Sequence, residues 1–339
     1  MTDNICNVAV DAMGGDFAPA SIVDGAKLAV RESETDLHVT LVGIEEKIYD
    51  AAPDIDDFKE NISIVHAPEV IDMCDPPVVA LREKKNSSIN VVAGLLKGKK
   101  ADAILSVGNT GAFMAASLFA AGKIEGVVRP TIGTFYPREN GEGFFLDVGG
   151  NTDCKPHQLF QFGIMGSTFF RLFKDKKEPS IGLLSIGEEP SKGNAVTIET
   201  HKLFSESSLN FIGNIEGNGI FSDKCDVIVC DGFIGNVLLK FMESIGGLFE
   251  SLFYSSVKNN SGETDMSILD EPVKKLKDAF NYEKYGGVPI LGINGVSIIG
   301  HGRSTPEAVK TAILLANKMY KEGLPDQIKK NIEIYKESS

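Results

Sequence analysis

The sequence predicts an α/β fold of three layers, in which a mainly parallel β-sheet lies between two layers of helices. The first supporting observation is a unit that occurs four times: a short apolar strand, a glycine-rich polar loop and then a helix. The second is that further short apolar runs alternate with helical patterns, as in parallel sheets covered on both faces. Parallel sheets bind ligands outside the carboxyl ends of their strands, so the four loops are the first candidates for a functional site.

The four strand–loop units are spread over most of the chain. Their strands and loops are, in order, Val8–Val10 with Asp11–Asp16, Ala103–Val107 with Gly108–Gly111, Ile181–Ile186 with Gly187–Asn194, and Asp226–Cys230 with Asp231–Asn236. Further strands are expected at His38–Val42, Ile62–His66, Phe144–Val148 and Phe211–Ile215. Near the C-terminal end, Asn294 and Gly295 separate two apolar runs and predict a β-hairpin over 288–299. Thr305 and Pro306 then form a typical helix start.

Composition indicates a globular protein and excludes a general nucleic-acid role. Hydrophobic residues make up 42% of the 339 residues and charged residues 24%. The net charge is −13, whereas a phosphate backbone requires a basic surface. The five cysteines are dispersed without a C-x-x-C pair, so we expect no disulfides, no metal site and a cytoplasmic location. The N-terminal residues carry no export signal.

The chain is expected to form a single unit over 1–339, with a helical excursion at 240–287. No linker rich in proline or serine divides it. Ala103–Gly122 is uncharged over the length of a membrane span, but the loop signal at 106–111 would leave backbone groups unsatisfied in lipid. That segment is therefore predicted to be a buried strand, a loop and a buried helix.

Several loop side chains suit an anionic ligand, although each also has a structural alternative. Lys192 is the only basic residue in the third loop, and it stands where the next helix begins; it suits a phosphate or an oxyanion, or it is a solvated loop lysine. Asn109 and Asn236 occupy strand-to-helix turns, where they either donate from their amides or stabilise the turn. His301 and Arg303 precede the last helix, and there a ligand contact and a structural role remain open.

Other features of the loops indicate which ligands and enzyme classes are compatible with the sequence. Asp11, Asp16 and Asp231 suit either a metal ion or helix capping. Helix N-termini attract anions such as phosphate, because they present free N–H groups and a partial positive charge. The chain contains no G-x-x-x-x-G-K-[ST] motif, no G-x-G-x-x-G after the first strand and no G-x-S-x-G. This argues against a P-loop ATPase, an ordinary dinucleotide enzyme and a covalent acyl-enzyme.

Six motifs, spread over about 300 residues in family order, resemble the phosphate acyltransferase (PlsX) family. They are Val8-Ala-Val-Asp-Ala-Met-Gly-Gly-Asp-Phe-Ala-Pro19, Ser106-Val-Gly-Asn-Thr-Gly-Ala112, Leu146-Asp-Val-Gly-Gly-Asn151, Gly187-Glu-Glu-Pro-Ser-Lys-Gly-Asn194, Asp231-Gly-Phe-Ile-Gly-Asn-Val237 and Gly300-His-Gly-Arg-Ser304. One departure is Gly150, where the family more often has alanine.

The resemblance implies an enzyme that transfers a fatty acyl group from acyl carrier protein to inorganic phosphate, yielding acyl phosphate for phospholipid synthesis without a cofactor. It implies an isocitrate/isopropylmalate dehydrogenase-like fold, as in phosphotransacetylases. It also implies a homodimer that is cytoplasmic, peripherally attached to the membrane and followed by a membrane glycerol-3-phosphate acyltransferase. The catalytic roles fall on Lys192 and Asn236. The expected substrate-binding residues are Asp11, Gly14, Gly15, Asp16, Asn109, Thr110, Gly111, Gly193, Asn194, Asp231, Gly232, Gly235 and His301.

Two other functions remain open from the sequence. One is a decarboxylating dehydrogenase that uses a metal ion and a nicotinamide on the same type of fold, for which the sequence offers no evident set of metal carboxylates. The other is a non-catalytic membrane scaffold for lipid enzymes.

The excursion at 240–287 predicts contacts outside the chain. An apolar stripe at helical spacing exceeds what one amphipathic helix needs, which favours a dimer; it comprises Leu238, Phe241, Met242, Ile245, Leu248, Phe249, Leu252 and Phe253. Lys240, Glu243 and Glu250 argue against a membrane span. Reversible contact with an anionic membrane is expected instead, through Leu252, Phe253, Val257, Lys274, Lys275 and Lys277. A solvated hairpin with a buried stripe is the plain alternative.

Overall fold

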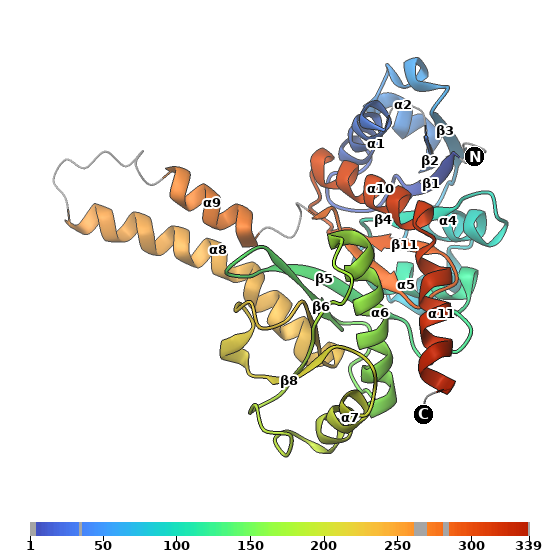
Figure 1. Cartoon of the computed structure of the whole chain (residues 1–339). Helices are drawn as coiled ribbons and strands as arrows, with labels where there is room; N and C mark the ends of the chain where they lie inside the picture. Colours follow the sequence, from blue (N-terminus) through green and yellow to red (C-terminus); the bar gives the residue numbers. More distant parts are fainter. Residues whose placement is uncertain (1–4, 34–35, 261–269, 281–284, 338–339) are drawn as a thin grey trace. The chain divides into compact units, whose positions relative to one another are not determined.

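The computed structural model describes residues 5–33, 36–260, 270–280 and 285–337, with the backbone alone at 256–260, 276–279 and 336–337 (Figure 1). The chain forms two compact units. Unit 1 comprises Met1–Ile132 and Tyr285–Ser339, and unit 2 comprises Gly133–Lys284. Each unit has its own set of parallel strands, and the prediction of a mostly parallel sheet with helices is confirmed.

The strands of unit 1 follow the order β3-β2-β1-β4-β11-β10. They are β1 (Cys6–Asp11), β2 (Leu37–Gly43), β3 (Ile62–His66), β4 (Ala103–Ser106), β10 (Val288–Leu291) and β11 (Val296–Ile299). β3, β2, β1, β4 and β11 run parallel to one another. β10 and β11 are antiparallel and form the hairpin that Asn294 and Gly295 predicted. The strands expected near residues 8, 38, 62 and 103 are also confirmed.

Helices cover both faces of the unit 1 strands. They are α1 (Ala20–Glu32), α2 (Glu45–Ala51), α3 (Pro77–Glu83), α4 (Ser88–Lys97), α5 (Thr110–Ala121), α10 (Pro306–Lys321) and α11 (Leu324–Glu337). α1 packs against α10 on one face, and α4 packs against α5 on the other. Gly25 of α1 permits a close helix approach, since a Cβ there would lie 2.5 Å from Val309 of α10. Thr305 caps α10 as expected, accepting a hydrogen bond from the Ala308 amide at 3.3 Å.

The strands of unit 2 follow the order β5-β6-β9-β7-β8. They are β5 (Thr131–Pro137), β6 (Glu142–Leu146), β7 (Ile181–Leu184), β8 (Phe211–Ile215) and β9 (Val227–Val229). β6, β9, β7 and β8 are parallel, and β5 is antiparallel to β6. The sequence did not predict β5, whose first two residues belong to unit 1 and pair with β10. The other four strands lie near the predicted positions.

The core of unit 2 is rich in aromatic side chains. Its helices are α6 (Pro156–Lys174), α7 (Ala195–Ser205), α8 (Gly232–Asn260) and α9 (Asp270–Phe280). α6 packs on β6 and β9, and the Phe144 and Phe169 rings stack with centroids 4.5 Å apart. Gly166 of α6 lies so close to Leu146 that a Cβ would overlap its side chain. This close approach fixes the helix over the strands that lead to the loops described below.

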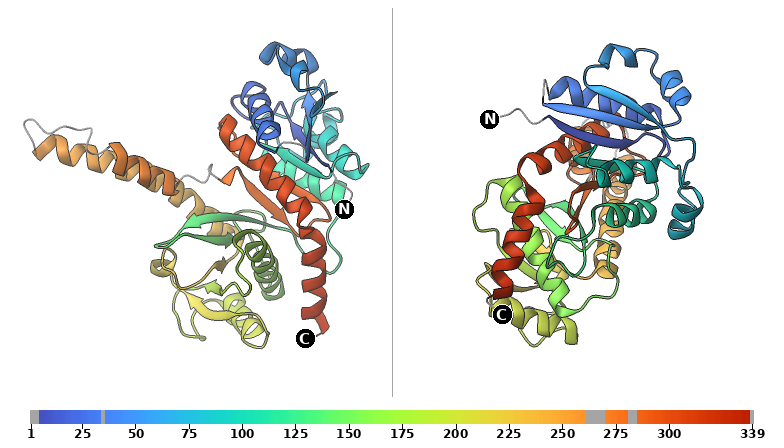
Figure 2. Two further views of the ribbon diagram at one scale, coloured as in Figure 1. Left: turned by 45° about the horizontal axis from the view of Figure 1, so that its top comes forward. Right: turned by 90° about the vertical axis from the view of Figure 1, so that its right-hand side faces the viewer.

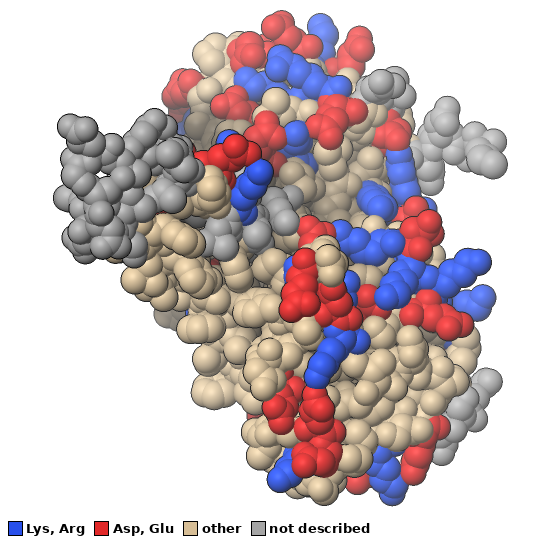
Figure 3. Space-filling view, turned by 60° about the vertical axis from the view of Figure 1, so that its left-hand side comes forward, with Lys and Arg blue, Asp and Glu red and all other residues tan. Residues whose placement is uncertain are grey.

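α8 and α9 lie side by side and extend beyond the strands of unit 2 (Figures 1 and 2). The Tyr254 hydroxyl donates to Asp270 at 2.8 Å and joins the two helices. By length and composition alone, Gly232–Ser255 of α8 is long and apolar enough to cross a membrane. On the face that Figure 3 displays, acidic and basic side chains are interspersed, with wide areas that carry neither.

The helical stripe of the predicted excursion divides between buried and exposed positions. Met242 and Ile245 are buried within the chain. The exposed members are Phe241, Leu248, Phe249, Leu252 and Phe253, and Lys274 and Lys275 of α9 are also exposed. The side chains of Val257 and Lys277 lie outside the described residues.

Candidate active site

Three loops of unit 2 leave the same edge of its strands. β6, β9 and β7 are parallel neighbours, so the segments that follow them start at one carboxyl edge. These segments are 147–151, 231–236 and 185–194. The two residues expected to be catalytic, Lys192 and Asn236, therefore follow adjacent strands of this edge. This is where a parallel sheet offers a ligand site.

Asp147 organises the first of these loops. Its side chain is fully buried directly after β6. Oδ1 accepts hydrogen bonds from the amides of Gly149 at 3.1 Å and Gly150 at 2.8 Å, and Oδ2 accepts one from the Asn151 side chain at 2.6 Å. These bonds compensate the carboxylate for its lost hydration and hold the loop in one conformation.

The start of α8 is packed directly on this loop. The Gly232 amide donates to the Asn151 carbonyl at 2.7 Å, and a Cβ at Gly235 would overlap the Asp147 carbonyl. Asp231 caps the helix, because its Oδ1 accepts from the Ile234 amide at 2.9 Å. The structure thus gives a packing or capping role at this edge to three residues that were expected to bind substrate: Asp231, Gly232 and Gly235.

Asn236 presents its amide from the second turn of α8. A Cβ at Gly149 would lie 3.5 Å from the Asn236 Cγ, so the amide stands over the glycine backbone of the first loop. Gly149 has φ +133°, a conformation that favours glycine. The Asn236 side chain is exposed and forms no hydrogen bond within the described part of the chain. Its NH₂ group is available to a ligand.

Lys192 stands on a fixed turn before α7. Its amide donates to the Glu189 carbonyl at 3.0 Å, and its carbonyl accepts from the Ser185 hydroxyl at 3.0 Å. The lysine stem packs on Gly187, where a Cβ would lie 2.6 Å from the Lys192 Cγ. The ammonium group is exposed and pairs with no acid among the residues described. A fixed backbone with a free cation suits the binding of an anion.

Gly193 and Asn194 complete the entry to α7. Gly193 has φ +119°, and a Cβ there would overlap the Thr197 hydroxyl. Asn194 caps α7, accepting from the Thr197 amide at 2.9 Å. The adjacent helix N-terminus adds its partial positive charge to that of Lys192.

Unit 1 contains a second set of loops at the carboxyl ends of β1, β4 and β11, which are neighbours. The buried Asp11 side chain accepts from the Ser106 hydroxyl at 2.6 Å and from the Met13 amide at 3.1 Å. Burial raises the pKa of the Asp11 carboxyl, and these bonds, with those from Ser88 and Gly14, offset the rise in part. Asp11 therefore joins the loop that follows β1 to the loop that follows β4.

Glycines bring these loops into backbone contact. A Cβ at Gly14 would lie 2.7 Å from the Gly108 amide nitrogen, and one at Gly15 would lie 2.8 Å from the Gly302 carbonyl. That carbonyl accepts from the Asp16 amide at 2.6 Å. Any side chain at Gly14 or Gly15 would thus separate the loops.

The remaining expected residues of unit 1 divide between structural and exposed positions. The Asn109 side chain is buried, caps α5 through the Ala112 amide at 3.0 Å and donates to carbonyls of the 72–75 segment. Thr110 and Gly111 are exposed in the first turn of α5. His301 is half-buried, and its Nδ1 accepts from the Arg303 amide at 3.2 Å.

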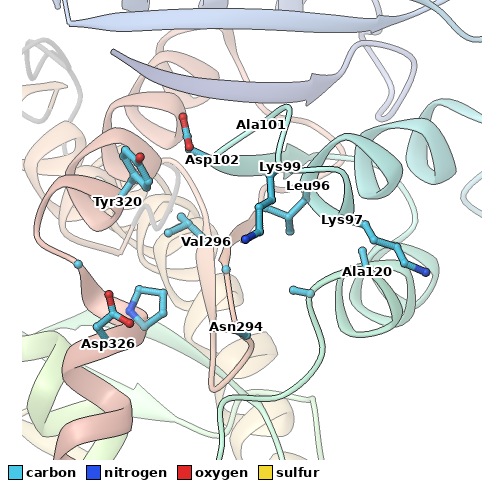
Figure 4. Close-up of a pocket in the computed structure, with 14 residues that line it drawn as sticks. Leu96, Lys97, Lys99, Ala101, Asp102, Ala120, Asn294, Val296, Tyr320 and Asp326 are labelled. Carbon is cyan, nitrogen blue, oxygen red and sulfur yellow. The ribbon is translucent and has the colours of Figure 1, made fainter. Parts of the chain in front are cut away.

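A cavity of about 380 Å³ lies at the opposite edge of the unit 1 strands, where β4 and β11 begin (Figure 4). Lys99 points into it, while Asp102 and Tyr320 lie on the other side. Burial and the nearby Asp102 raise the pKa of the Tyr320 hydroxyl. None of the residues expected from the sequence lines this cavity, so it is separate from the candidate site of either unit.

The structure thus groups the expected residues into two sets. Lys192, Gly193 and Asn194 lie with Asn236 and its neighbours at the unit 2 edge, and the others lie at the unit 1 edge. Sequence reasoning did not single out Asp147 or Ser106, although an aspartate directly after an apolar strand repeats the pattern of Asp11. Over the described ranges, no three His, Cys, Asp or Glu side chains form a group suited to a metal ion.

Comparison with known proteins gives consistent results. Residues 6–327 match the family model described as "Fatty acid synthesis protein". The chain is 44% identical to the phosphate acyltransferase of Pelotomaculum thermopropionicum, covering 96% of this chain and 95% of the relative. It is also 44% identical to the phosphate acyltransferase of Desulforamulus reducens, covering 96% and 97%.

Solved structures with the same fold are much more distant in sequence. A phosphotransacetylase from Streptococcus pyogenes superposes with a TM-score of 0.63 at 16% identity, covering 94% of each chain. A branched-chain phosphotransacylase from Enterococcus faecalis superposes with a TM-score of 0.61 at 13% identity, covering 93% of this chain and 99% of the other. These similarities establish the fold class.

Proposed function

We propose, because this chain belongs to the phosphate acyltransferase family, that it transfers a fatty acyl group from acyl carrier protein to inorganic phosphate. The acyl phosphate formed would enter phospholipid synthesis. The observation that carries the proposal is the arrangement at the unit 2 edge, where an unpaired lysine and an unpaired amide follow neighbouring parallel strands. A cation and a neutral donor can both stabilise the negative charge that develops in this reaction.

The chemistry needs positioning and charge stabilisation more than a strong base. An oxygen of hydrogen phosphate attacks the thioester carbonyl carbon, a C–O bond forms, the C–S bond breaks, and the phosphate proton ends on the released thiol. Phosphate is already a nucleophile at neutral pH. Holding it against the thioester in the correct orientation can supply much of the rate acceleration.

Lys192 would bind the phosphate and the negative charge that develops during attack. Its backbone is fixed at two points, which places the base of the lysine side chain at this edge. The N-terminus of α7, which begins at Ala195, adds to the positive potential.

Asn236 would donate a hydrogen bond to the thioester carbonyl oxygen or to phosphate. Such a donor is most effective when it is already oriented toward the forming oxyanion. Its orientation is supported by the contact with Gly149 and by the packing of α8 on the Asp147 loop. Asp147 is thus a positioning residue, which acts through the loop that supports Asn236.

The unit 1 loops would bind substrate at the carboxyl edge of their own strands. Thr110 and Gly111 are exposed in the first turn of α5, where backbone N–H groups lack partners inside the helix. Asp16, Gly14 and Gly15 set the shape of the neighbouring loop, and His301 lies on the third. On this proposal the whole of 1–339 acts as a single phosphate acyltransferase, with an isocitrate/isopropylmalate dehydrogenase-like fold and no cofactor.

Two interactions outside the chain belong to the same proposal. The exposed apolar residues of α8 would contribute to a homodimer and, near Leu252 and Phe253, to a peripheral membrane contact. Lys274 and Lys275 are exposed on α9, although Lys275 also pairs with Glu271 at 2.8 Å. Membrane contact would bring the apolar product near a downstream membrane glycerol-3-phosphate acyltransferase.

Direct assay of the purified protein tests the proposed activity. Palmitoyl-acyl carrier protein and phosphate should give acyl phosphate, trapped as a hydroxamate, together with one free carrier thiol. No product should form without phosphate. Product formation by the protein alone excludes a pure scaffold. An absorbance change with nicotinamide, divalent metal and hydroxy acids, without acyl phosphate formation, would contradict the proposal.

A further inference from the structure

We infer that Asn214, held in one orientation by His201, positions the turn that carries Lys192 and thereby sets the affinity of the protein for phosphate. The inference rests on the proposed function, since that function assigns Lys192 to phosphate. All three residues belong to unit 2, as does Glu189, through whose backbone the contact runs. Asn214 and His201 would act through this turn rather than on the substrate, so both are positioning residues.

The main-chain carbonyl of Glu189 is the point where β8 meets this turn. The Asn214 side-chain amide donates to it at 2.9 Å, and the Lys192 backbone amide donates to the same oxygen at 3.0 Å. A carbonyl oxygen has two lone pairs, so both hydrogen bonds form together. Asn214 lies on β8, and it is only 5% exposed. A buried side chain from the strand next to β7 therefore holds the turn that begins at Glu189 and ends at Lys192.

His201, on α7, determines which way the Asn214 amide faces. Its Nδ1 lies 2.9 Å from the Asn214 Oδ1. Because the Glu189 carbonyl can only accept, the NH₂ group of Asn214 must face Glu189, and its oxygen must face His201. The His201 Nδ1 therefore carries a proton and donates it to this hydrogen bond. Both ends of the buried amide are used, which offsets the cost of removing it from water.

The other end of the turn is attached to β8 by a separate route. The Ser185 hydroxyl donates to the Lys192 carbonyl at 3.0 Å, and the Ser185 amide donates to the Ile215 carbonyl at 2.9 Å. Asn214 and Ile215, which are adjacent on β8, thus hold the two ends of the turn. Loss of the Asn214 donor releases the Glu189 end alone. A displacement of about 1 Å in a binding group is enough to weaken its action by one to two orders of magnitude.

Two substitutions of His201 separate its hydrogen bond from its packing. The His201 ring also lies edge-on to Phe211, with ring centroids 5.0 Å apart. His201→Phe keeps an aromatic ring and removes the donor, whereas His201→Asn removes the ring and offers an amide donor near the place of Nδ1. His201→Phe should raise the KM for phosphate by about tenfold, and His201→Asn should stay close to the wild type. The KM for the acyl carrier substrate, measured at saturating phosphate, should change little in either variant.

Asn214→Asp tests the other hydrogen bond of the same amide. It keeps an oxygen toward His201 but turns a second oxygen, in place of the NH₂ group, toward the Glu189 carbonyl. The KM for phosphate should again rise by about tenfold or more. Asn210→Asp is the matched control, because the Asn210 side chain also donates to a main-chain carbonyl, that of Glu178 at 3.2 Å, away from the Lys192 turn. It should leave the KM for phosphate unchanged.

A double substitution shows whether His201 acts through Lys192. In a Lys192→Ala protein the turn no longer carries the cation, so adding His201→Phe should lower kcat/KM for phosphate little further. Residues that act as one unit are non-additive in this way, whereas independent effects multiply. A structural role for His201 elsewhere in the fold would lower kcat/KM by the same factor in both backgrounds.

Four results would overturn the inference while acyl phosphate formation by the wild type stands. They are an unchanged phosphate KM in the folded His201→Phe protein, a loss in His201→Asn that exceeds the loss in His201→Phe, a rise confined to the KM for the acyl carrier substrate, and fully multiplicative effects of His201→Phe and Lys192→Ala. A folded wild type that forms no acyl phosphate would contradict the proposed function, and the inference with it. His201 is half-buried, so His201→Phe is expected to fold and to decide the matter even if Asn214→Asp does not fold.

Discussion

The main-chain carbonyl of Asp147 lies directly against Gly235, with no room for a Cβ between them. This contact joins the end of β6 to the first turn of α8. Asp147 also fixes its own loop through three hydrogen bonds, so one residue sets the position of both the loop and the helix that carries Asn236. The geometry proposed for catalysis therefore depends on the close contact of Gly235 with Asp147.

Gly235→Ala should displace the start of α8. The added methyl group must move backbone, which costs about 1–3 kcal/mol for overpacking in a well-packed region. We expect the thermal midpoint to fall by several degrees and acyl phosphate formation to fall with it. Gly247→Ala on the same helix is the control, since a Cβ there meets nothing within 4 Å. It should keep or raise stability, because alanine favours helix. Equal effects of the two substitutions would contradict the packing role of Gly235.

The buried Asp11 predicts a specific dependence of stability on pH. Burial raises the pKa of its carboxyl above the usual value, so the folded protein binds this proton more tightly than the unfolded chain. The contribution of Asp11 to stability is fully present below the usual aspartate pKa. It is lost as pH rises through the pKa that this carboxyl has in the folded protein. Asp11→Asn removes the titration. The thermal midpoint of the wild type relative to the variant should therefore fall as pH rises from about 4, and a difference that is constant with pH would contradict this.

For Asp226 we expect the opposite dependence of stability on pH. It is buried, and although burial alone raises its pKa, hydrogen bonds from Lys176 and Ser180 and the Lys176 charge lower it below the usual value. The contribution of Asp226 to stability is present above the usual aspartate pKa. It is lost as pH falls through the pKa that this carboxyl has in the folded protein. The advantage of wild type over Asp226→Asn should shrink on acidification. An advantage that grows on acidification would be inconsistent with the ion pairs seen here.

Membrane contact through the outer part of α8 is open to a sedimentation test. Leu252 and Phe253 are 50% and 43% exposed, so burying what remains of both in a bilayer would favour binding by about 0.7–1.5 kcal/mol each. Vesicles with anionic lipid should bind the wild type, and added salt should weaken the binding. Replacing both residues by serine and Lys274 and Lys275 by glutamine should reduce binding at least about tenfold. Phe119→Ser is the control. Vesicle binding by the quadruple variant that equals wild-type binding would contradict the proposal.

Dimerisation is tested separately by light scattering. The wild type should show twice the 36.5 kDa mass of one chain at micromolar concentration. Phe241 is exposed, whereas Met242 beside it is buried within the chain, so Phe241→Asp places a charge on the outer face of α8 without disturbing the core. It should shift the protein toward the mass of one chain. A monomeric wild type would count against the dimer.

Local sequence patterns predicted much of the fold because each depends on neighbouring residues. The hairpin at Asn294 and Gly295 and the cap at Thr305 have turn and helix-start signals within a few residues. β5 was not predicted. All its residues but Pro137 are buried, so it lacks the alternation of a half-exposed strand, and a glycine and a proline interrupt the apolar run. Unit 1 combines both ends of the chain, and such long-range packing leaves no local signal.

The same limit applies to the candidate site. The loops around Lys192 and Asn236 were identified from their position after apolar strands. The use of the Asn109 amide was not, because its acceptors lie more than thirty residues away in the 72–75 segment. Nor does the sequence indicate that Gly235 contacts Asp147, since that contact depends on two strands lying side by side. Local patterns predict which loops are candidates for a site, and tertiary packing determines which of their side chains remain exposed.

The role of Lys192 is the central claim, and acyl phosphate formation by Lys192→Ala tests it most directly. The exposed side chain can be removed without disturbing the fold, while loss of charge stabilisation should lower kcat/KM by about 100-fold or more. Lys202→Ala, at an exposed lysine on α7, is the matched control and should retain wild-type activity. A folded Lys192→Ala protein that forms acyl phosphate at the wild-type rate would contradict the account.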